Sequence, residues 1–312
     1  MAWDLKEGDA VFVPDFTFFA SAETVAFERA TPVFVDVEEN TFNISPSSLR
    51  YAIEKVIEEG KLIPKAIVAV DLFGLPANYD EIRKIAEEYH LFLLEDGAQG
   101  FGGTLHEKRA CSFGDISTTS FFPAKPLGCY GDGGAIFTDD DEWADLIRSY
   151  RIHGKGNDKY DNVRIGMNSR LDTIQAAILQ VKLKAFQQYE LQAVNQVAKY
   201  YTKELKEYVQ VPIIPEGFYS SWAQYSILLE NKKQRDGLQE YLKKNGIPSM
   251  IYYPKAMHKQ KAFQEIECAI TELSITETLC DRVLALPMHP YLDKEEQDKV
   301  IWSIKEYIKS IK

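Results

Sequence analysis

Lysine 125 is the residue of this sequence best suited to covalent chemistry. Lys125 lies between two prolines, in a glycine-rich loop that follows a strand-like run containing Ser120. Apolar neighbours remove water from an amine, which lowers its pKa and leaves more of it in the neutral, nucleophilic form. Such an amine can condense with a carbonyl group. An exposed loop lysine without a chemical role is the alternative interpretation.

A second group of polar residues follows another apolar run. Residues 91–94 are apolar, and Glu95, Asp96 and Gln99 come directly after them. Ligands of open α/β sheets bind beyond the carboxyl ends of the strands, so we expect Asp96 and Gln99 to face a site. An acidic residue that merely ends a strand is the alternative here.

Together these residues meet the needs of pyridoxal 5'-phosphate (PLP) chemistry. PLP requires an amine for its aldehyde, a carboxylate for its pyridine nitrogen and donors for its phosphate, and Lys125, Asp96 and Ser120 supply one of each. The carboxylate keeps the ring protonated, and the protonated ring is the electron sink that stabilises a carbanion. The combination therefore predicts a PLP site.

The segments that must position these residues follow an α/β pattern. Short apolar runs alternate with segments whose apolar residues recur at helical spacing, which is typical of βα units in a mostly parallel sheet. We expect strands at 10–13, 32–35, 66–70, 91–94, 116–121 and 135–138, and helices at 46–59, with Ser45 as N-cap, and at 79–89.

The second half of the chain changes in character. A mainly helical stretch runs from 171 to about 208, and the proline-containing segment 211–217 follows it. We therefore predict a large domain, 1–208, and a smaller C-terminal α+β domain, 209–312. The small domain is expected to contain a strand at 225–229, a helix at 234–245 and an amphipathic helix from Lys294.

Composition excludes several classes of function. The net charge of −11 argues against nucleic-acid and anionic-membrane partners, because such surfaces need clustered Lys and Arg. No apolar run approaches the roughly 20 residues that span a bilayer. The cysteines lack metal-ligand spacing, so we expect no metal site and a reduced, cytoplasmic protein. These cysteines are Cys111, Cys129, Cys268 and Cys280.

Three segments resemble a known family. They are EDGAQ at 95–99, SFFPAKPLGCYGDGG at 120–134 and GMNSRL at 166–171. The chain resembles the DegT/DnrJ/EryC1/StrS sugar aminotransferases over essentially its whole length. The resemblance implies the PLP-dependent transferase fold type I, which is aspartate-aminotransferase-like, with a mostly parallel sheet sandwiched by helices. Within the family the chain is most similar to enzymes that aminate UDP-2-acetamido-2-deoxy-3-oxo-glucuronate.

The resemblance also implies roles for single residues. Lys125 would carry PLP as a Schiff base and move a proton between the two substrate carbons, and Asp96 would pair with the pyridinium nitrogen. Gln99 would lie beside the phenolic oxygen of the ring, and Ser120 would bind the phosphate. Phe18 matches the aromatic residue that stacks on the ring, and a core phenylalanine is the alternative.

Four more residues match positions farther along the family pattern. Asn168 and Arg170 match residues that reach the partner's cofactor phosphate, which implies a homodimer with shared active sites. A helix N-cap at Asn168 and a solvated Arg170 are the alternatives. His289 and Tyr291 match the segment that lines the nucleotide-sugar pocket, although a loop histidine without a ligand has the same appearance. Tyr253 receives no role.

The implied reaction moves an amino group from L-glutamate, which leaves as 2-oxoglutarate, to a nucleotide-linked keto-sugar in surface-polysaccharide biosynthesis. Family members usually begin about sixty residues earlier and bind the cofactor phosphate partly at a helix N-terminus. We therefore expect part of the phosphate site to be missing and apolar surface to be exposed. An inactive remnant of the fold is one alternative. A PLP-dependent sugar dehydratase is another, disfavoured because those enzymes typically replace the lysine with histidine.

Overall fold

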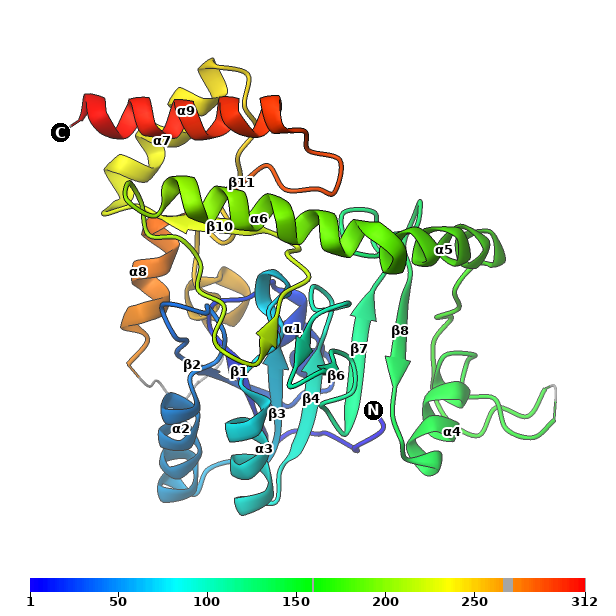
Figure 1. Cartoon of the computed structure of the whole chain (residues 1–312). Helices are drawn as coiled ribbons and strands as arrows, with labels where there is room; N and C mark the ends of the chain where they lie inside the picture. The colour runs from blue at the N-terminus through cyan, green and yellow to red at the C-terminus, as the bar shows by residue number, and fades with distance from the viewer. Residues whose placement is uncertain (159, 266–271, 312) are drawn as a thin grey trace.

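A six-stranded sheet forms the centre of the computed structural model, which describes residues 1–158, 160–265 and 272–311 (Figure 1). The first five strands in the sheet order are parallel, and the last, at the edge, is antiparallel to its neighbour. The order is β2 (Thr31–Val35), β1 (Asp9–Pro14), β3 (Ile63–Val70), β4 (Phe92–Asp96), β7 (Ile116–Ser120) and β8 (Gly134–Phe137). All six predicted strands are thereby confirmed, with shifts of a few residues at their ends.

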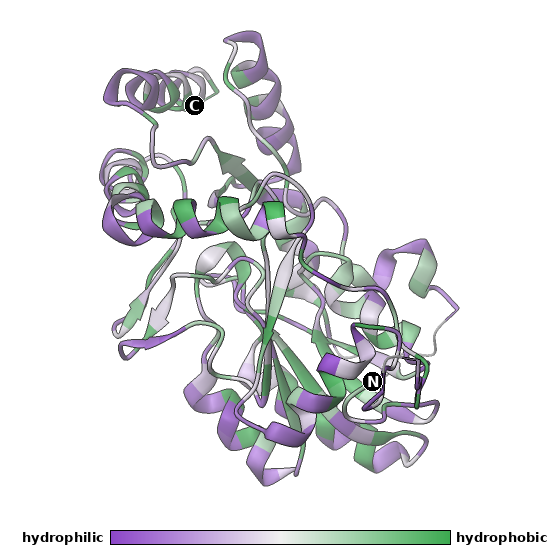
Figure 2. Ribbon diagram, turned by 90° about the vertical axis from the view of Figure 1, so that its right-hand side faces the viewer, coloured by the Kyte–Doolittle hydropathy of each residue, from purple (hydrophilic) through white to green (hydrophobic). Residues whose placement is uncertain are grey.

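Side chains alternate between the two faces of this sheet and are buried on both. On one face Ala10 and Phe12 pack with residues of α2 (Pro46–Glu59) and α3 (Tyr79–Glu88). On the other face Val11 and Val13 pack with α1 (Ala20–Phe27) and with segments from the C-terminal part of the chain. The strands are accordingly among the most hydrophobic segments in Figure 2.

Local sequence explains the best-predicted helix. Ser45 is the N-cap of α2 and accepts a hydrogen bond from the N–H of Ser48, and Pro46 occupies the first helical position. Gly60 ends the helix in the left-handed conformation, with a φ of 64°. The predicted helices at 46–59 and 79–89 are confirmed.

Beyond residue 171 the chain adds further elements beside the sheet (Figure 1). A long helical run crosses the top of the sheet as α5 (Thr173–Ala185), a π-helical turn (Phe186–Glu190) and α6 (Leu191–Leu205) (Figure 1). Two antiparallel strands and three helices follow: β10 (Tyr225–Leu228), α7 (Lys232–Lys244), α8 (Ser274–Arg282), β11 (Val283–Leu286) and α9 (Lys294–Ser310). The mixture of elements is that of the predicted α+β unit. The division between residues 208 and 209 stays a prediction.

Several elements were not predicted from the sequence. They are α1, α4 (Asp141–Tyr150), α8, β11 and a three-stranded sheet of β6 (Lys108–Arg109), β5 (Thr104–Leu105) and β9 (Phe218–Tyr219). The last sheet joins distant parts of the chain, because β9 pairs with β5.

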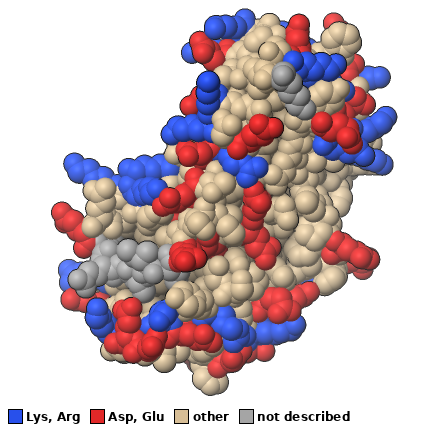
Figure 3. Space-filling model, turned by 90° about the vertical axis from the view of Figure 1, so that its left-hand side faces the viewer, with Lys and Arg blue, Asp and Glu red and all other residues tan. Residues whose placement is uncertain are grey.

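Exposed apolar surface was expected, and the sheet carries an apolar groove of about 260 Å³ between the N-terminal residues and Met167. Strand residues Val68, Leu94 and Ile136 contribute to its lining. On the face drawn in Figure 3, acidic and basic side chains are interspersed, without a continuous basic surface over the residues shown in colour.

Within residues 1–158, 160–265 and 272–311, no helix has both the length and the apolar character needed to cross a membrane. The same residues contain no group of three or more His, Cys, Asp or Glu side chains placed to hold a metal ion. Cys268 lies outside the described residues.

Candidate active site

Asp96 is fixed at the carboxyl end of β4 by hydroxyl groups from the segment that follows β1. Ser21, in the first turn of α1, donates a hydrogen bond from Oγ to Asp96 Oδ2 over 2.7 Å. Thr17 Oγ1 lies 3.0 Å from the same Ser21 oxygen. Because Ser21 gives its only hydroxyl proton to Asp96, Thr17 is the donor in the second bond. Ala98 N–H donates to Asp96 Oδ1, so both carboxylate oxygens are held.

Lys125 follows the neighbouring strand, β7, as the sequence predicts. Asp96 is the register partner of Thr118 on β7, which places the ends of β4 and β7 side by side. The Lys125 side chain is half-buried. This burial lowers the pKa of its amine, and the negative charge of Asp96 opposes part of that shift. The lysine and the carboxylate are therefore close enough to influence each other.

Gln99 is buried and makes hydrogen bonds at both ends of its amide. Its Oε1 accepts from the N–H of Phe73 at 2.6 Å, and its Nε2 donates to the hydroxyl of Tyr253 at 3.2 Å. Burial raises the pKa of the Tyr253 hydroxyl, which keeps it protonated. Tyr253 is a site residue that sequence reasoning missed. No spacing pattern could link it to Gln99, which lies 154 positions away.

Two phenylalanines after β1 have different environments. Phe18 is 56% exposed, whereas Phe16 is 1% exposed and belongs to the core. The Phe18 ring lies with its centroid 6.3 Å from that of Tyr253. The core alternative for Phe18 is therefore wrong, and its exposed ring is free to contact a ligand.

Ser120, the last residue of β7, is half-buried, and its Oγ accepts a hydrogen bond from the N–H of Phe122. Its hydroxyl proton remains available for an acceptor such as a phosphate oxygen. Thr119, next to Ser120, lines an open cleft of about 980 Å³ together with Asn168 and Arg170. The following helix begins at Thr173 with Asp172 at its N-cap position, so the N-cap alternative for Asn168 is wrong. Arg170 is exposed.

The two predicted substrate residues lie on the segment after β11. His289 and Tyr291 are both exposed, and His289 Nδ1 accepts from the N–H of Tyr291. The Tyr291 hydroxyl donates to Glu190 in the π-helical turn and lies 3.3 Å from the hydroxyl of Tyr189. The hydrogen bonds described for this pair thus join it to the helical turn and not to Asp96.

The residues at the ends of β4 and β7 fit the chemical groups of PLP. A half-buried amine with a lowered pKa is suited to an aldehyde, an oriented carboxylate to a pyridinium nitrogen, and an exposed aromatic ring to a flat heterocycle. A mostly parallel sheet with these groups beyond its strand ends is the arrangement expected of a PLP-dependent transferase of fold type I.

Comparison with known proteins gives the family. Residues 1–305 match the DegT/DnrJ/EryC1/StrS aminotransferase family, and the chain belongs to this family. It is 42% identical over 294 residues to the UDP-2-acetamido-2-deoxy-3-oxo-D-glucuronate aminotransferase of Pseudomonas aeruginosa, covering 94% of this chain and 78% of that protein. The predicted family, fold class and aminotransferase activity are thus confirmed.

Two solved structures extend the comparison. A family member from Brucella abortus is 52% identical, with a TM-score of 0.94 over 97% of this chain and 80% of that chain. NtdA from Bacillus subtilis, solved with the bound cofactor PMP, is 30% identical, with a TM-score of 0.87 over 99% of this chain and 69% of that chain. The cofactor of this aminotransferase is PLP, as predicted.

Proposed function

We propose that this aminotransferase transfers the amino group of L-glutamate to the 3-oxo carbon of UDP-2-acetamido-2-deoxy-3-oxo-D-glucuronate, for amino-sugar biosynthesis in surface polysaccharides. The similarity to the Pseudomonas aeruginosa enzyme carries this proposal, because it extends over 94% of the chain. The site at Asp96, Gln99 and Lys125 lies within that length.

Each residue of the site is proposed to have a separate role in the transfer of the amino group. When bound, PLP supplies an electron sink for the carbon that gains or loses a proton. Asp96, oriented by Ser21, keeps a proton on the ring nitrogen. Lys125 holds the cofactor and moves the substrate proton, and the lowered pKa of its amine makes it a better base near neutral pH. Phe18 would cover the ring of the bound cofactor, and Gln99 would lie beside its phenolic oxygen.

The phosphate of the cofactor would be bound by Ser120 on one side. We propose that Asn168 and Arg170 bind the phosphate in a partner subunit, so that the functional unit is a homodimer with shared active sites. Exposed apolar side chains on β8 and α5 support an interface there, because large apolar surfaces are normally covered in soluble proteins. They include Ile136, Phe137, Ile174 and Val181.

His289 and Tyr291 are proposed to contact the nucleotide sugar. Both side chains are exposed, and His289 uses Nδ1 to accept from the N–H of Tyr291, which leaves its Nε2 available to a ligand. We also propose a cytoplasmic location. The buried free thiols of Cys111, Cys129 and Cys280 suit a reducing compartment.

The direct test uses the full chain, PLP, L-glutamate and the UDP-linked 3-oxo sugar. Formation of 2-oxoglutarate, followed with a coupled dehydrogenase, should depend on both substrates and should be lost in Lys125→Ala. His289→Ala should raise KM for the sugar and leave KM for glutamate unchanged. Failure to bind PLP at millimolar concentration would instead favour an inactive remnant, and activity only with a different keto-sugar would refute the substrate.

A further inference from the structure

A chain of three ionisable side chains lies behind the candidate active site. His258 Nδ1 is 2.6 Å from Asp15 Oδ2, and His258 Nε2 is 3.2 Å from Glu277 Oε1. The N–H of His258 also donates to Asp15 Oδ1 over 2.8 Å. Asp15 is fully buried, whereas Glu277 is nearly half exposed. The three residues come from distant parts of the chain: the end of β1, a 3₁₀ turn (Met257–Lys259) and α8.

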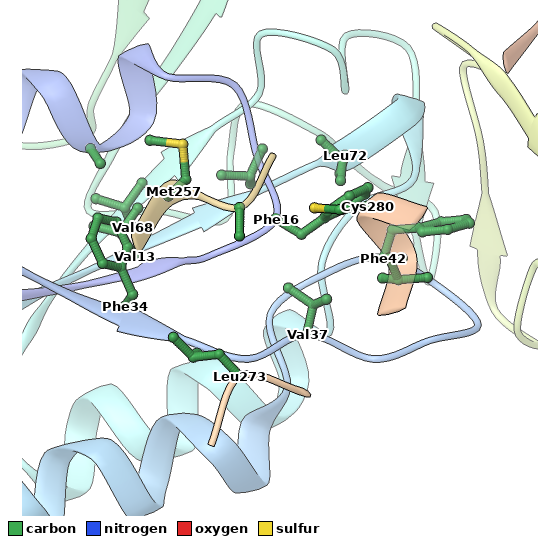
Figure 4. Packing of buried hydrophobic residues seen from close by; sticks show 14 of the residues in the cluster. Val13, Phe16, Phe34, Val37, Phe42, Val68, Leu72, Met257, Leu273 and Cys280 are labelled. Atoms are coloured by element: carbon green, nitrogen blue, oxygen red, sulfur yellow. The ribbon is translucent and has the colours of Figure 1, made fainter. Parts of the chain in front are cut away.

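Asp15 is anchored on the sheet, so it can hold the turn in place. Its N–H donates to Val35 O in β2, and its own carbonyl accepts from Met257 N–H over 3.0 Å. Apolar contacts reinforce the attachment. Phe16, Met257 and Cys280, one from each of the three segments, belong to a single buried cluster (Figure 4).

The segment before Met257 and the segment after Asp15 both contain residues of the candidate active site. Four residues before Met257, Tyr253 accepts a hydrogen bond from Gln99 and lies beside Phe18. Two residues after Asp15, Thr17 contacts Ser21, which orients Asp96. The bond between Asp15 and His258 therefore joins the segment that carries Tyr253 to the segment that orients Asp96.

We propose that Asp15, His258 and Glu277 form a latch that holds Tyr253 against Gln99 while the imidazole is protonated, and that loosens when the imidazole loses a proton. The three residues act as positioning residues for the cofactor end of the sheet. This inference rests on the proposed placement of the cofactor at Asp96, Gln99 and Lys125.

The protonation state matters because both imidazole nitrogens face a carboxylate. Only the imidazolium can donate from Nδ1 and Nε2 together, and the neutral ring leaves one lone pair against a negative charge. The hydrogen bond to Asp15 raises the pKa of His258 above its ordinary value of 6.5, and the bond to Glu277 adds to this effect. Since the folded pKa is raised, the latch is fully stabilising below about pH 6.5 and weakens as the pH rises through the folded pKa.

Other charged groups around the latch modify it without replacing it. Lys259 pairs with Glu277 at 2.8 Å and lowers the pKa of that carboxyl. Burial raises the pKa of Asp15, the charge of Asp36 adds to this effect, and the bonds to His258 oppose it. The Cys280 thiol lies in the same cluster, and burial, with the charges of Asp15 and Asp281, raises its pKa. It stays neutral over the working range.

The experiment measures hydrogen exchange of residues 252–260 in the full chain from pH 6 to 9.5, corrected for intrinsic exchange, with and without PLP. Protection should fall as the pH rises through the titration of His258, because its pKa is raised by the bonds to Asp15 and Glu277. PLP affinity should fall through the same pH range. His258→Gln should show low protection and no such transition, while His106→Asn, which removes an exposed imidazole–carboxylate pair with Asp80, should behave like the wild type.

Glu277→Gln gives the decisive result, because it keeps a hydrogen-bonding group at a partly exposed position but removes a negative charge. The pH midpoint of the protection change should move downward. A midpoint that stays in place, or a wild-type profile equal to that of His258→Gln, would overturn the latch. The exchange data without PLP test the latch alone, whereas absence of PLP binding at every pH would contradict the proposed site and leave a titrating latch intact.

Discussion

Glu95 and Asp96 are adjacent carboxylates to which the structure gives separate tasks, and substitution should separate them. The Glu95 side chain is completely buried. Its carboxylate accepts hydrogen bonds from the N–H groups of Cys111 and Phe113 and from the Ser117 hydroxyl, the last two at 2.7 Å. Glu95 therefore fixes the loop between β4 and β7, while Asp96, on the opposite face of the strand, faces the candidate cofactor site.

The size of the effect follows from the hydrogen bonds of Glu95. Glu95→Gln replaces one accepting oxygen by an NH₂ group. The least costly orientation puts this group at Oε1, where only the Cys111 N–H loses its acceptor, which lowers the free energy of unfolding by about 1–3 kcal/mol. The remaining bonds lose about 1 kcal/mol more because their acceptor is no longer ionised. We expect the free energy of unfolding to fall by about 2–4 kcal/mol. Asp96→Asn, which keeps an acceptor for Ser21, should change it by less than about 1 kcal/mol.

Urea unfolding of the PLP-free protein measures the first effect as a lower midpoint at unchanged slope. Titration with PLP and steady-state turnover measure the second. Folded Glu95→Gln should bind PLP with nearly wild-type affinity, whereas Asp96→Asn should lose most of its turnover. The reverse outcome, with a large loss of stability in Asp96→Asn and of PLP affinity in Glu95→Gln, would refute this division.

Two further predictions concern buried charges. Burial, with the charge of Glu95, raises the pKa of Asp71 well above 3.8, and a raised folded pKa means that stability is lost as the pH rises through it. Asp71→Asn keeps an acceptor for the Tyr79 hydroxyl, so its urea midpoint should exceed that of the wild type by more at pH 8 than at pH 5; a constant difference would contradict this. Arg235, 2% exposed, donates to the carbonyls of Cys280 and Val283. Arg235→Met should therefore cost about 2–4 kcal/mol in urea unfolding, against almost nothing for the exposed control Lys233→Met.

Local patterns in the sequence predict much of the sheet and the residues at its strand ends. Most of the six strands are apolar runs, and α2 has its N-cap, its proline and its terminal glycine in the expected places. Asp96 is in register with Thr118, two residues before Ser120, so the pairing of β4 with β7 brings the two strand ends side by side. By contrast, α1 has no side-chain cap at Phe19 and little separation of polar from apolar residues, so nothing local marks it as a helix.

The contacts that close the site depend on long-range packing. Gln99 and Tyr253 are 154 residues apart, and Asp15 and His258 are 243 residues apart. Neither pair has a periodic or motif-like spacing, because each is brought together by the C-terminal segment packing on the sheet. The site residues at the strand ends could therefore be predicted from the sequence, whereas those on the turn that carries Tyr253 and His258 could not.

The central claim is that Lys125 carries the cofactor. The most direct measurement is to add PLP to the full chain, fix it by borohydride reduction, and map the modified lysine by mass spectrometry of the digested protein. Because burial beside Asp96 lowers the pKa of the Lys125 amine, the adduct should form on Lys125 at one equivalent of PLP and should vanish in Lys125→Ala. An adduct spread over exposed lysines, or one that persists in Lys125→Ala, would contradict the claim.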